Sequence, residues 1–395
     1  MSVKQNVIAL LEENRSKVIS GQELANQLHV SRAAIWKAIK TLKEEGYNIE
    51  ATPNKGYVLL ENSDVLSKQG IAYYLTEEID IFSYKTIDST NTQMKKLAIN
   101  GGKNHSVIVS EEQSAGRGRF GRSFYSPAQK GVYMSVLLKT GDSLQNATMI
   151  TIKTAVAVRR AIAKLYDIEV AIKWVNDLYY RGKKVCGILS EAISDFESGM
   201  IEAIIIGIGI NVSTDNFPLE IASIATSLGL QEANRNQFIA EILNQLFAII
   251  DEDFKLVLNE YRMASCVLHK QITFNQKGEQ FTGLVREIND LGNLVVSSNG
   301  AEMVLTAGEV SIIGGNHGAE TERGRRCREC HAGRHCREHP VCRARHGCRN
   351  RSRCHAGRSH YRHHAQPSQL PEGGRRPGRC QFRGGEPRRH DRLRE

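Results

Sequence analysis

The composition of the chain changes abruptly near residue 316, and this change limits how much of the chain can fold. Residues 316–395 contain no Lys, Ile, Met or Trp and consist largely of Arg, Gly, His and Cys. A segment with so few large apolar side chains cannot bury enough surface to offset the entropy lost on ordering it. We therefore expect the folded domains to lie within residues 1–315, and residues 316–395 to form a disordered tail.

The tail also carries a regular pattern of cysteines. They recur every six residues at Cys330, Cys336, Cys342, Cys348 and Cys354, and the string CHAGR occurs twice. Three interpretations are open: a tail that binds zinc or nucleic acid, a disordered cationic tail, and the out-of-frame translation of a hexapeptide-repeat gene. A zinc domain needs paired ligands and a small apolar core. The tail has the ligand-like pair Cys327-x-x-Cys330 but lacks the complete paired set and the apolar core, so we favour out-of-frame translation.

The net charge of +10 comes from the tail and not from the folded part. Residues 1–315 hold 32 Lys and Arg against 35 Asp and Glu, whereas residues 316–395 hold 21 Arg against 8 acidic residues. The only cysteines before the tail are Cys186 and Cys266, which fits a reducing compartment without a disulfide framework. With no long apolar run and no signal-peptide pattern, the sequence predicts a cytoplasmic protein without a membrane partner.

Residues 1–62 predict a small domain of three helices and a hairpin. Apolar residues at helical spacing indicate the first helix, a capping box of Ser20 and Glu23 starts the second, and Ser31 caps the third. A hairpin over residues 47–60 follows the third helix. Two helices joined by a tight turn and followed by a hairpin are typical of a winged helix-turn-helix.

The third predicted helix buries Ile35, Ile39 and Leu42 and turns its basic side chains outward. In a winged helix-turn-helix this helix enters the major groove, and basic side chains of helix and wing contact phosphates. The candidate DNA-binding residues are Ser31, Arg32, Lys37, Lys40 and, in the wing, Lys55. Trp36 could face the groove or fill the core, and we favour the core because a lone tryptophan is mostly buried. The alternative is a helical protein-interaction domain, whereas binding to a palindromic operator implies a homodimer.

Residues 116–122 read Gly-Arg-Gly-Arg-Phe-Gly-Arg and follow a predicted strand over residues 106–113. Glycines let the backbone bend sharply and expose its N–H groups, and arginines supply planar forks for carboxylate or phosphate oxygens. The stretch therefore predicts an anion-binding loop. The alternative is a solvated basic surface turn.

Two further clusters carry polar residues next to predicted strands. Residues 173–178 indicate a strand with Asn176 and Asp177 at its end, and Arg181-Gly182 predicts a hairpin turn before Lys184. Residues 204–212 form an apolar strand in which glycines stand at two positions. Glycine inside a strand often marks close approach by a ligand or by another backbone.

Together these motifs resemble those of the biotin protein ligases. The matching residues are Asp88-Ser89-Thr90-Asn91, Gly116-Arg117-Gly118-Arg119 with Gly121-Arg122, Lys173-Trp174 with Asn176-Asp177-Leu178, Lys184 before Cys186-Gly187-Ile188-Leu189, and Gly207-Ile208-Gly209-Ile210-Asn211. With the predicted winged helix in front, the chain resembles the bifunctional form, biotin ligase and biotin-operon repressor in one chain. The resemblance covers residues 1–314, with five motifs in the family's order.

The resemblance implies an α+β multidomain protein. Its parts would be a winged helix-turn-helix over residues 1–62, a mixed α/β ligase domain over residues 66–265 and an SH3-like β-barrel over residues 267–314. The last range alternates short apolar strands with Gly and Asn turns, at residues 271–275, 282–288, 294–296, 303–305 and 310–313.

The family's activity joins biotin and ATP into biotinyl-5'-AMP and passes the biotin to a lysine of a carrier protein. The implied substrates and cofactors are biotin, ATP and Mg²⁺, and the implied acceptor is the biotin carboxyl carrier protein of acetyl-CoA carboxylase and similar carboxylases. The adenylate would also be the corepressor, favouring a homodimer that binds operator DNA and represses biotin genes.

The resemblance also assigns residues to this chemistry. A carboxylate that attacks a phosphate needs preplaced cations, and the catalytic candidates are Lys184, Arg117 and Arg119. The biotin-binding candidates are Ser89, Thr90, Asn91, Gln113, Arg117, Gly118, Arg119 and Lys184. The nucleotide-binding candidates are Arg122, Phe124, Asn176, Asp177 and Asn211. No protein side chain is assigned as a metal ligand, and residues 115–122 are expected to fold over the adenylate.

Two positions depart from the family pattern. Val175 stands where proline is usual, and Phe124 stands where tryptophan is frequent. We expect valine to continue the strand and phenylalanine to stack more weakly on adenine. Two rival functions are a ligand-responsive repressor without catalysis, which retention of the cations argues against, and a lipoate or octanoyl transferase, whose loop motifs the sequence lacks.

Overall fold

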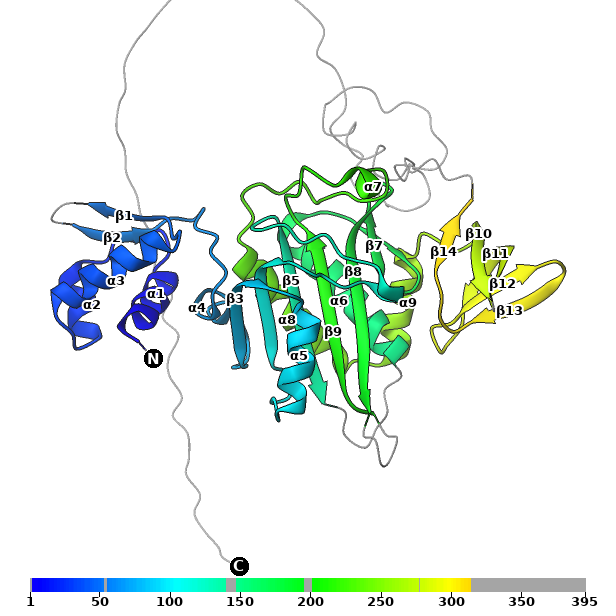
Figure 1. Ribbon diagram of the computed structural model, residues 1–395, viewed down its shortest axis with the longest axis horizontal. Helices are drawn as coiled ribbons and strands as arrows, with labels where there is room; N and C mark the ends of the chain where they lie inside the picture. The colour runs from blue at the N-terminus through cyan, green and yellow to red at the C-terminus, as the bar shows by residue number, and fades with distance from the viewer. Residues whose placement is uncertain (1, 53–54, 140–146, 195–200, 277, 314–395) are drawn as a thin grey trace, which may run out of the picture. The chain divides into compact units, whose positions relative to one another are not determined.

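The computed structural model describes residues 2–52, 55–139, 147–194, 201–276 and 278–313. Within these ranges the chain forms three helices with a hairpin, then a large mixed sheet with its helices, then a five-stranded antiparallel sheet (Figure 1). The predictions for the tail, including its disorder and its binding of zinc or nucleic acid, concern residues outside these ranges.

The N-terminal module is a winged helix-turn-helix, as predicted. It contains α1 (Val3–Glu13), α2 (Gly21–Gln27), α3 (Arg32–Glu44) and the hairpin of β1 (Ile49–Thr52) and β2 (Gly56–Leu59). Each helix begins at a serine N-cap whose side chain accepts a hydrogen bond from a backbone N–H group, at Ser2, Ser20 and Ser31. Helices and hairpin share one core, which includes Leu11, Leu24, Ile35, Leu42 and Leu59.

The prediction that Trp36 fills this core is wrong. Trp36 is 60% exposed on the surface of α3. The buried stripe of the helix consists of Ile35, Ala38, Ile39 and Leu42. The residue after Ile35 lies about 100° further around the helix and therefore projects away from the stripe. The core of the module is closed without the indole ring.

The central domain is built on a seven-stranded sheet in the order β3-β4-β5-β9-β8-β7-β6. The strands are β3 (Ile81–Ile87), β4 (Val107–Gln113), β5 (Gly131–Lys139), β6 (Ala171–Lys173), β7 (Asp177–Tyr180), β8 (Lys183–Ser194) and β9 (Ile201–Asn211). β3 and β4 pair in parallel, and the other neighbouring strands pair antiparallel. The expected mixed α/β domain is therefore confirmed.

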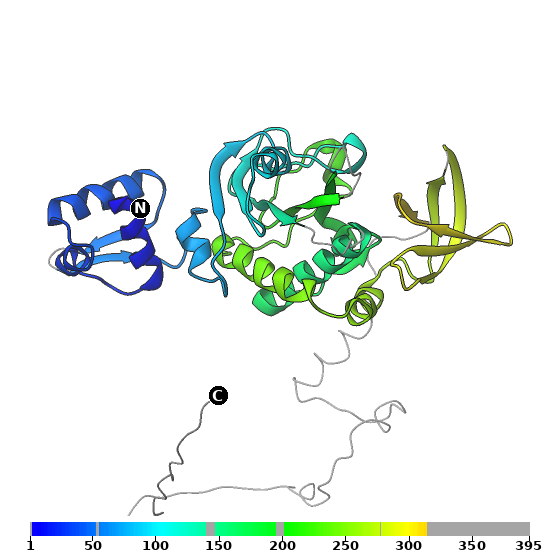
Figure 2. The ribbon, with the colours of Figure 1, turned by 90° about the horizontal axis from the view of Figure 1, so that it is seen from below.

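Helices cover both faces of this sheet (Figure 2). α6 (Ala147–Tyr166), α8 (Arg235–Ile250) and α9 (Phe254–Ala264) lie on one side, and α5 (Thr90–Ile99) lies on the other. Successive side chains of one strand consequently enter two cores. Val107 and Val109 pack in the large core with α6 and α8, while Ile108 packs with Met94 of α5. Short helices α4 (Lys68–Ala72) and α7 (Leu219–Ala222) complete the domain.

Two hairpins present the polar cluster of residues 173–184. The β7–β8 turn is Arg181-Gly182, as predicted, and both residues have positive φ, 48° and 77°. The prediction that Val175 continues the preceding strand is wrong, because β6 ends at Lys173, which pairs with Asp177 across the intervening turn. Val175 lies in that turn with its side chain buried, and the Trp174–Val175 peptide bond is cis.

The C-terminal sheet has the order β13-β12-β11-β10-β14 and is antiparallel throughout, which fits the predicted SH3-like domain. Its strands are β10 (Gln271–Gln276), β11 (Glu279–Ile288), β12 (Leu294–Ser298), β13 (Ala301–Leu305) and β14 (Val310–Ile312). Trp174 Nε1 donates to the carbonyl of Gly292 at 2.9 Å, and Arg262 Nε donates to the carbonyl of Ile288 at 2.7 Å. These bonds fasten the sheet to the central domain. The exact domain boundaries stay predictions.

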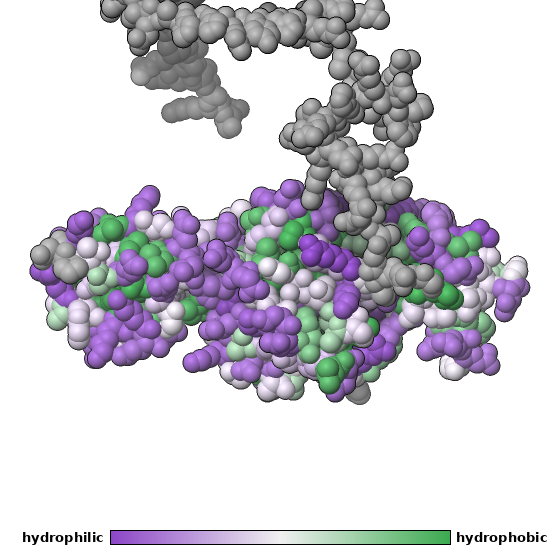
Figure 3. Space-filling view, turned by 90° about the horizontal axis from the view of Figure 1, so that it is seen from above, coloured by the Kyte–Doolittle hydropathy of each residue, from purple (hydrophilic) through white to green (hydrophobic). Residues whose placement is uncertain are grey.

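The surface of the described residues is mostly hydrophilic in the view of Figure 3, with hydrophobic residues in small groups. Among the described residues, no helix has the length and apolar character required to cross a bilayer.

Candidate active site

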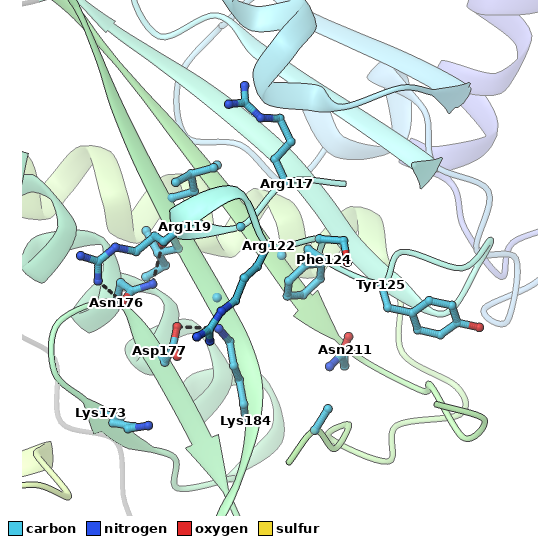
Figure 4. A pocket seen from close by; sticks show the side chains of 18 of the residues that line it. Arg117, Arg119, Arg122, Phe124, Tyr125, Lys173, Asn176, Asp177, Lys184 and Asn211 are labelled. Carbon is cyan, nitrogen blue, oxygen red and sulfur yellow. Dashed lines mark hydrogen bonds and ion pairs between the residues drawn. The ribbon is translucent and has the colours of Figure 1, made fainter. Parts of the chain in front are cut away.

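A cavity of about 440 Å³ collects every residue that the sequence assigned to biotin, nucleotide or catalysis (Figure 4). Its wall comes from the start of α5, the end of β4, the glycine–arginine loop, the β6–β8 hairpins and the end of β9. Residues of the segments 217–225 and 308–312 close the remaining sides. A volume of a few hundred Å³ suits a small organic ligand.

One end of the cavity is a network of polar side chains at the start of α5. Ser89 is the N-cap of the helix, and Thr90 donates from its backbone N–H to Gln113 Oε1 at 2.8 Å. Gln113 Nε2 in turn donates to Ser126 Oγ at 2.9 Å. Ser135 Oγ lies 2.8 Å from Thr90 Oγ1. Gln113 Oε1 also accepts from Thr90 Oγ1 at 3.1 Å, so the fixed amide keeps one Nε2 N–H donor for a ligand.

Asn91 is buried beside this network and is bonded on both sides by the protein. Its Nδ2 donates to Glu191 Oε2 at 2.8 Å, and its Oδ1 lies 2.6 Å from Ser135 Oγ. A Cβ added at Gly207 would lie 2.2 Å from Asn91 Oδ1, so glycine is required there for the side chain to fit. The group that approaches Gly207 is therefore a side chain, and not the ligand or backbone that the sequence suggested.

The glycine–arginine loop is held by its own backbone. Phe124 N–H donates to the carbonyl of Gly116 at 2.9 Å, and Gly118 N–H donates to the carbonyl of Arg122 at 2.7 Å. A Cβ at Gly116 would lie 2.4 Å from the carbonyl oxygen of Phe124, so this close contact excludes any larger residue. The loop thus has a defined shape that directs its arginines.

The three arginines of the loop take different directions (Figure 4). Arg119 donates from Nη1 to Asn176 Oδ1 at 2.9 Å and to the carbonyl of Gly308 at 3.1 Å. Arg122 pairs with Glu309 at 2.7 Å. Arg117 points away from these two and lies 3.4 Å from Glu191. The structure therefore does not bring the three guanidinium groups to one point.

Burial distinguishes Arg119 from a surface arginine. Desolvation lowers the pKa of its guanidinium, and the charges of Asp177 and Glu309 oppose this effect. An arginine nonetheless remains a cation in a protein at neutral pH. Arg119 therefore places a positive charge of reduced hydration in the cavity wall, where it attracts an anion more strongly than in water.

Lys184 faces the cavity from the start of β8. Its Nζ lies 2.7 Å from Asp177 Oδ1, across the β7–β8 hairpin (Figure 4). A Cβ at Gly187 would lie 3.1 Å from Lys184 Nζ and 3.5 Å from the Phe124 ring. Because glycine has no Cβ, the ammonium group and the ring can both lie close to the strand at this position. Lys184 and Phe124 are consequently neighbours in one cavity.

Phe124 packs against β9. A Cβ at Gly209 would lie 2.6 Å from its ring, so the group that approaches this glycine is the Phe124 side chain and not another backbone. Tyr133 meets the same ring edge-on, with centroids 6.4 Å apart. The ring is thus held in place with room beside it for a planar ligand group.

Asn211 ends β9 with an unsatisfied acceptor. Its Nδ2 donates to the carbonyl of Thr226 at 3.0 Å, whereas its buried Oδ1 has no hydrogen-bond partner among the described residues. An unpaired buried acceptor costs about 1–3 kcal/mol. A ligand that donates to this oxygen, or a cation that binds it, would recover that energy.

Several residues that support or line the cavity were not predicted from the sequence. Ser135, Ser126 and Glu191 hold the predicted side chains, and the segments 217–225 and 308–312 form part of the wall. A serine inside the apolar run of β5 was a usable signal for Ser135. No local pattern marks the two wall segments, because their place depends on chain packing.

The predicted DNA-binding side chains lie on the winged helix. Arg32, Lys37, Lys40 and Lys55 are exposed, and Ser31 Oγ accepts from Ala34 N–H as the N-cap of α3. Within the described residues, no group of three or more His, Cys, Asp or Glu side chains is placed to hold a metal ion.

The chain is similar in sequence to known protein families and to individual proteins. A model of the Biotin/lipoate A/B protein ligase family matches residues 83–211, and a model of an HTH domain matches residues 3–58. The bifunctional ligase/repressor BirA of Bacillus subtilis is 32% identical over 314 residues, which cover 75% of this chain and 95% of the relative. The bifunctional ligase/repressor BirA of Escherichia coli is 28% identical over 319 residues, which cover 79% and 97%.

A solved structure supports the same placement. The biotin protein ligase from Aquifex aeolicus in complex with biotin and ATP matches with a TM-score of 0.52 and 25% sequence identity, over 59% of this chain and 97% of that chain. The catalytic-domain match spans the glycine–arginine loop and both cavity hairpins, and the HTH match spans the whole winged helix. The chain therefore belongs to the biotin protein ligase family, in its bifunctional ligase/repressor form.

Proposed function

We propose that the protein joins biotin to ATP and then transfers the biotin to a lysine of a biotin carboxyl carrier protein, such as that of acetyl-CoA carboxylase. The observation that carries this proposal is the position of Lys184, paired with Asp177 at 2.7 Å and adjoining Phe124 in the cavity. The ring can stack on the adenine base and so place ATP in the cavity. The fixed cation beside it would offset the repulsion between the biotin carboxylate and the α-phosphate.

The first step would form biotinyl-5'-AMP. A biotin carboxylate oxygen attacks the α-phosphorus. The bond between the α-phosphorus and the oxygen that bridges the α- and β-phosphates breaks, and pyrophosphate leaves with that oxygen. Both reactants are anions, so Lys184 and Arg119 would offset their repulsion and the charge that develops at the α-phosphate. No covalent bond to the protein is needed, and positioning supplies much of the rate.

The two ends of the cavity suit the two substrates. The network of Ser89, Thr90 and Gln113 offers fixed donors and acceptors for the ureido ring of biotin. At the other end, Phe124 would stack on adenine, with Arg122, Asn176 and Asn211 near the nucleotide. Gly118 and Arg117 of the loop, together with Asn91, remain proposed contacts on the biotin side.

Mg²⁺ would enter with ATP. The described residues provide no cluster of ligands for a resident ion, but the unpaired Asn211 Oδ1 and the Asp177 carboxylate supply oxygens beside the nucleotide. Mg²⁺ commonly binds through one or two protein oxygens plus substrate phosphates, so this donor set fits. When bound, the ion would neutralise charge on the departing pyrophosphate.

In the second step the amine of the carrier lysine would attack the acyl carbon of the adenylate. AMP leaves, the amine loses a proton, and an amide remains.

The adenylate would also act as corepressor and favour a homodimer that binds operator DNA. Arg32, Lys37 and Lys40 of α3 and Lys55 of the wing would contact the DNA, with Ser31 at the cap of α3. We further propose a cytoplasmic location, where carboxylases and DNA are both available.

Exchange of labelled pyrophosphate into ATP tests the first step without a carrier. We expect exchange that depends on biotin and Mg²⁺ and that neither lipoate nor octanoate supports. Exchange with lipoate or octanoate in place of biotin would favour the related acyl-transfer activities instead. No exchange with any acid, in a protein that still binds DNA, would favour a repressor without catalysis.

A further inference from the structure

Trp36 is a large aromatic side chain that the winged helix leaves in solvent. It is 60% exposed, although the module contains a closed apolar core of its own. Other large apolar side chains of the chain are also exposed, so Trp36 is distinguished by its position and its neighbours. Trp36 lies on the second turn of α3, which begins at Arg32.

The surroundings of the ring are basic. Between residues 32 and 43, every charged residue of α3 is positive, and the acidic residues Glu44 and Glu45 follow only after its last turn begins. Arg32 and Lys40 lie one turn before and one turn after Trp36, and Lys40 Nζ lies 5.8 Å from the ring centroid. Such a surface is complementary to a polyanion.

Trp36 also lines a hollow between three parts of the module. The hollow is bounded by the start of α2 at Ser20 to Gln22, the start of α3 at Arg32 and Ala33, and the hairpin at Thr52, Lys55 and Tyr57. The exposed ring and Ala33 form its apolar part, and Arg32 and Lys55 form its cationic rim. The side chains that would hold phosphates therefore surround an apolar surface.

This arrangement fits the edge of a DNA double helix in the major groove. The first residues of a recognition helix contact base edges there. The bases of a duplex are stacked, so an indole ring meets only their edges, and the one apolar group on those edges is the C5-methyl of thymine. Apolar side chains at this place in a helix contact that methyl group.

We propose that Trp36 is a specificity-determining residue that reads thymine, with its ring packed on the C5-methyl group in the major groove. Arg32 and Lys55 hold the flanking phosphates and bring the ring to the base edge. This inference rests on the proposed repressor function, and it adds the chemical group that is recognised.

The test uses the full chain with biotin, ATP and Mg²⁺. A duplex is first enriched from a random-sequence pool, and each thymine of its binding site is then replaced by uracil, which removes one methyl group. At one or more positions in each half-site we expect the affinity of the wild-type protein to fall about fourfold, the value of one buried methylene. Trp36→Ala should bind the thymine and uracil duplexes equally.

Two control variants separate base reading from other effects. Lys55→Ala should weaken binding to thymine and uracil duplexes by the same factor, because a phosphate contact does not sense the base. Trp36→Phe should keep part of the preference for thymine. An unchanged unfolding midpoint in Trp36→Ala would show that the module still folds, as expected for an exposed side chain.

The outcomes are distinguishable. A wild-type protein that is indifferent to every uracil substitution, or a Trp36→Ala variant that keeps the full preference, would overturn the inference while the repressor function stands. If no duplex is enriched, both the inference and the DNA-binding part of the proposed function fall, and the ligase activity is unaffected.

Discussion

Lys184 is the residue on which the proposed chemistry depends most. Its ammonium group lies in the cavity beside Asp177, whereas the adjacent Lys183 donates from Nζ to the carbonyl of Ala222 at 2.9 Å and does not line the cavity. We expect Lys184→Ala to lower the rate of adenylate formation about 10²–10³-fold, the usual effect of removing one electrostatic contact to a transition state.

Lys183→Ala is the matched control, since it removes the same charge from the neighbouring position of β8. Single-turnover formation of biotinyl-adenylate measures both variants. Equal rates in the wild type and Lys184→Ala would remove the catalytic role assigned to Lys184, and an equal loss in both variants would point to net charge instead.

Glu191 accepts hydrogen bonds from Asn91 and Lys95 and forms an ion pair with Arg117. Asn91 and Arg117 are two of the predicted biotin-binding residues. Burial alone would raise the pKa of its carboxyl group, but hydrogen bonds from Lys95 and Asn91 and the charges of Lys95 and Arg117 outweigh it and lower the pKa. A carboxyl group with a lowered pKa in the folded state stabilises the fold fully above its unfolded pKa. That stabilisation is lost as the pH falls through the folded pKa.

Glu191→Gln should therefore be less stable than the wild type by about 1 kcal/mol at neutral pH. The difference should shrink as the pH falls below the unfolded value of 4.5. Urea unfolding of both proteins from about pH 7 to about pH 3 measures this trend, because the loss lies below pH 4.5. A difference that stays constant with pH would contradict it, and Glu202→Gln at an exposed position of β9 is the control.

Sequence reasoning at the residue scale succeeded where a pattern is local. Ser20 and Ser31 cap their helices, and Arg181-Gly182 turns its hairpin, because these roles depend on near neighbours. The prediction for Trp36 followed the average burial of tryptophan, although the helical spacing places this residue outside the buried stripe of α3. The structure agrees with the spacing. The links of Glu191 to Asn91 and Lys95 join distant parts of the chain, so no local pattern announces them.

At the scale of elements, the glycine–arginine loop is joined to two other parts of the cavity wall by Arg119. Its guanidinium bonds Asn176 in the β6–β7 turn and the carbonyl of Gly308 before β14. Arg119→Gly removes both bonds and leaves the backbone of the loop intact. We expect the fold to survive and bound biotinyl-adenylate to dissociate about tenfold faster or more, the loss expected for a charged hydrogen bond.

Release of labelled adenylate from the purified complex measures this effect. Arg181→Gly is the control, because Arg181 has a positive φ that glycine adopts readily and, unlike its neighbour Gly182, does not line the cavity. Retention of the adenylate by Arg119→Gly at the wild-type rate would show that Arg119 does not help to close the loop.

A second element-scale feature fixes the segment between the winged helix and the central domain. Arg235 at the start of α8 is 2% exposed and bonds both the side chain and the carbonyl of Asp64. It also pairs with Glu111 of β4 at 2.7 Å. The next residue, Asn236, donates to the carbonyl of Val65 at 2.9 Å. One helix end therefore clamps the connecting segment to the sheet.

Arg235→Ala removes this partner from the buried carboxylate of Glu111 and from the partly buried carboxylate of Asp64. We expect a loss of about 3–5 kcal/mol in unfolding free energy, as for other broken buried ion pairs. Arg160→Ala removes an arginine whose pairs with Glu252 and Glu260 are partly exposed, and it should cost less than Arg235→Ala because water can solvate the carboxylates it leaves. Urea unfolding followed by circular dichroism compares them, and equal losses would argue against the clamp.

At the scale of the whole molecule, the cavity depends on segments that the sequence separates widely. Ser89 at the start of α5 and Gly308 before β14 line the same cavity, and Glu309 pairs with Arg122 of the loop. The order of the motifs identified the family and hence the ligase fold. The wall segments 217–225 and 308–312 follow only from packing of the chain, which is why the sequence did not indicate them.

Transfer of biotin to a carrier is the measurement that tests the proposed ligase function most directly. The full chain is mixed with biotin, ATP, Mg²⁺ and a purified carboxyl-carrier domain, and intact-mass spectrometry follows the carrier. We predict one biotin on one lysine of the carrier, formed by the wild type and by Lys183→Ala, and at most a trace with Lys184→Ala. The account would be contradicted if the folded wild-type protein left the carrier unmodified. It would also be contradicted if the protein attached lipoate, and not biotin, to the carrier.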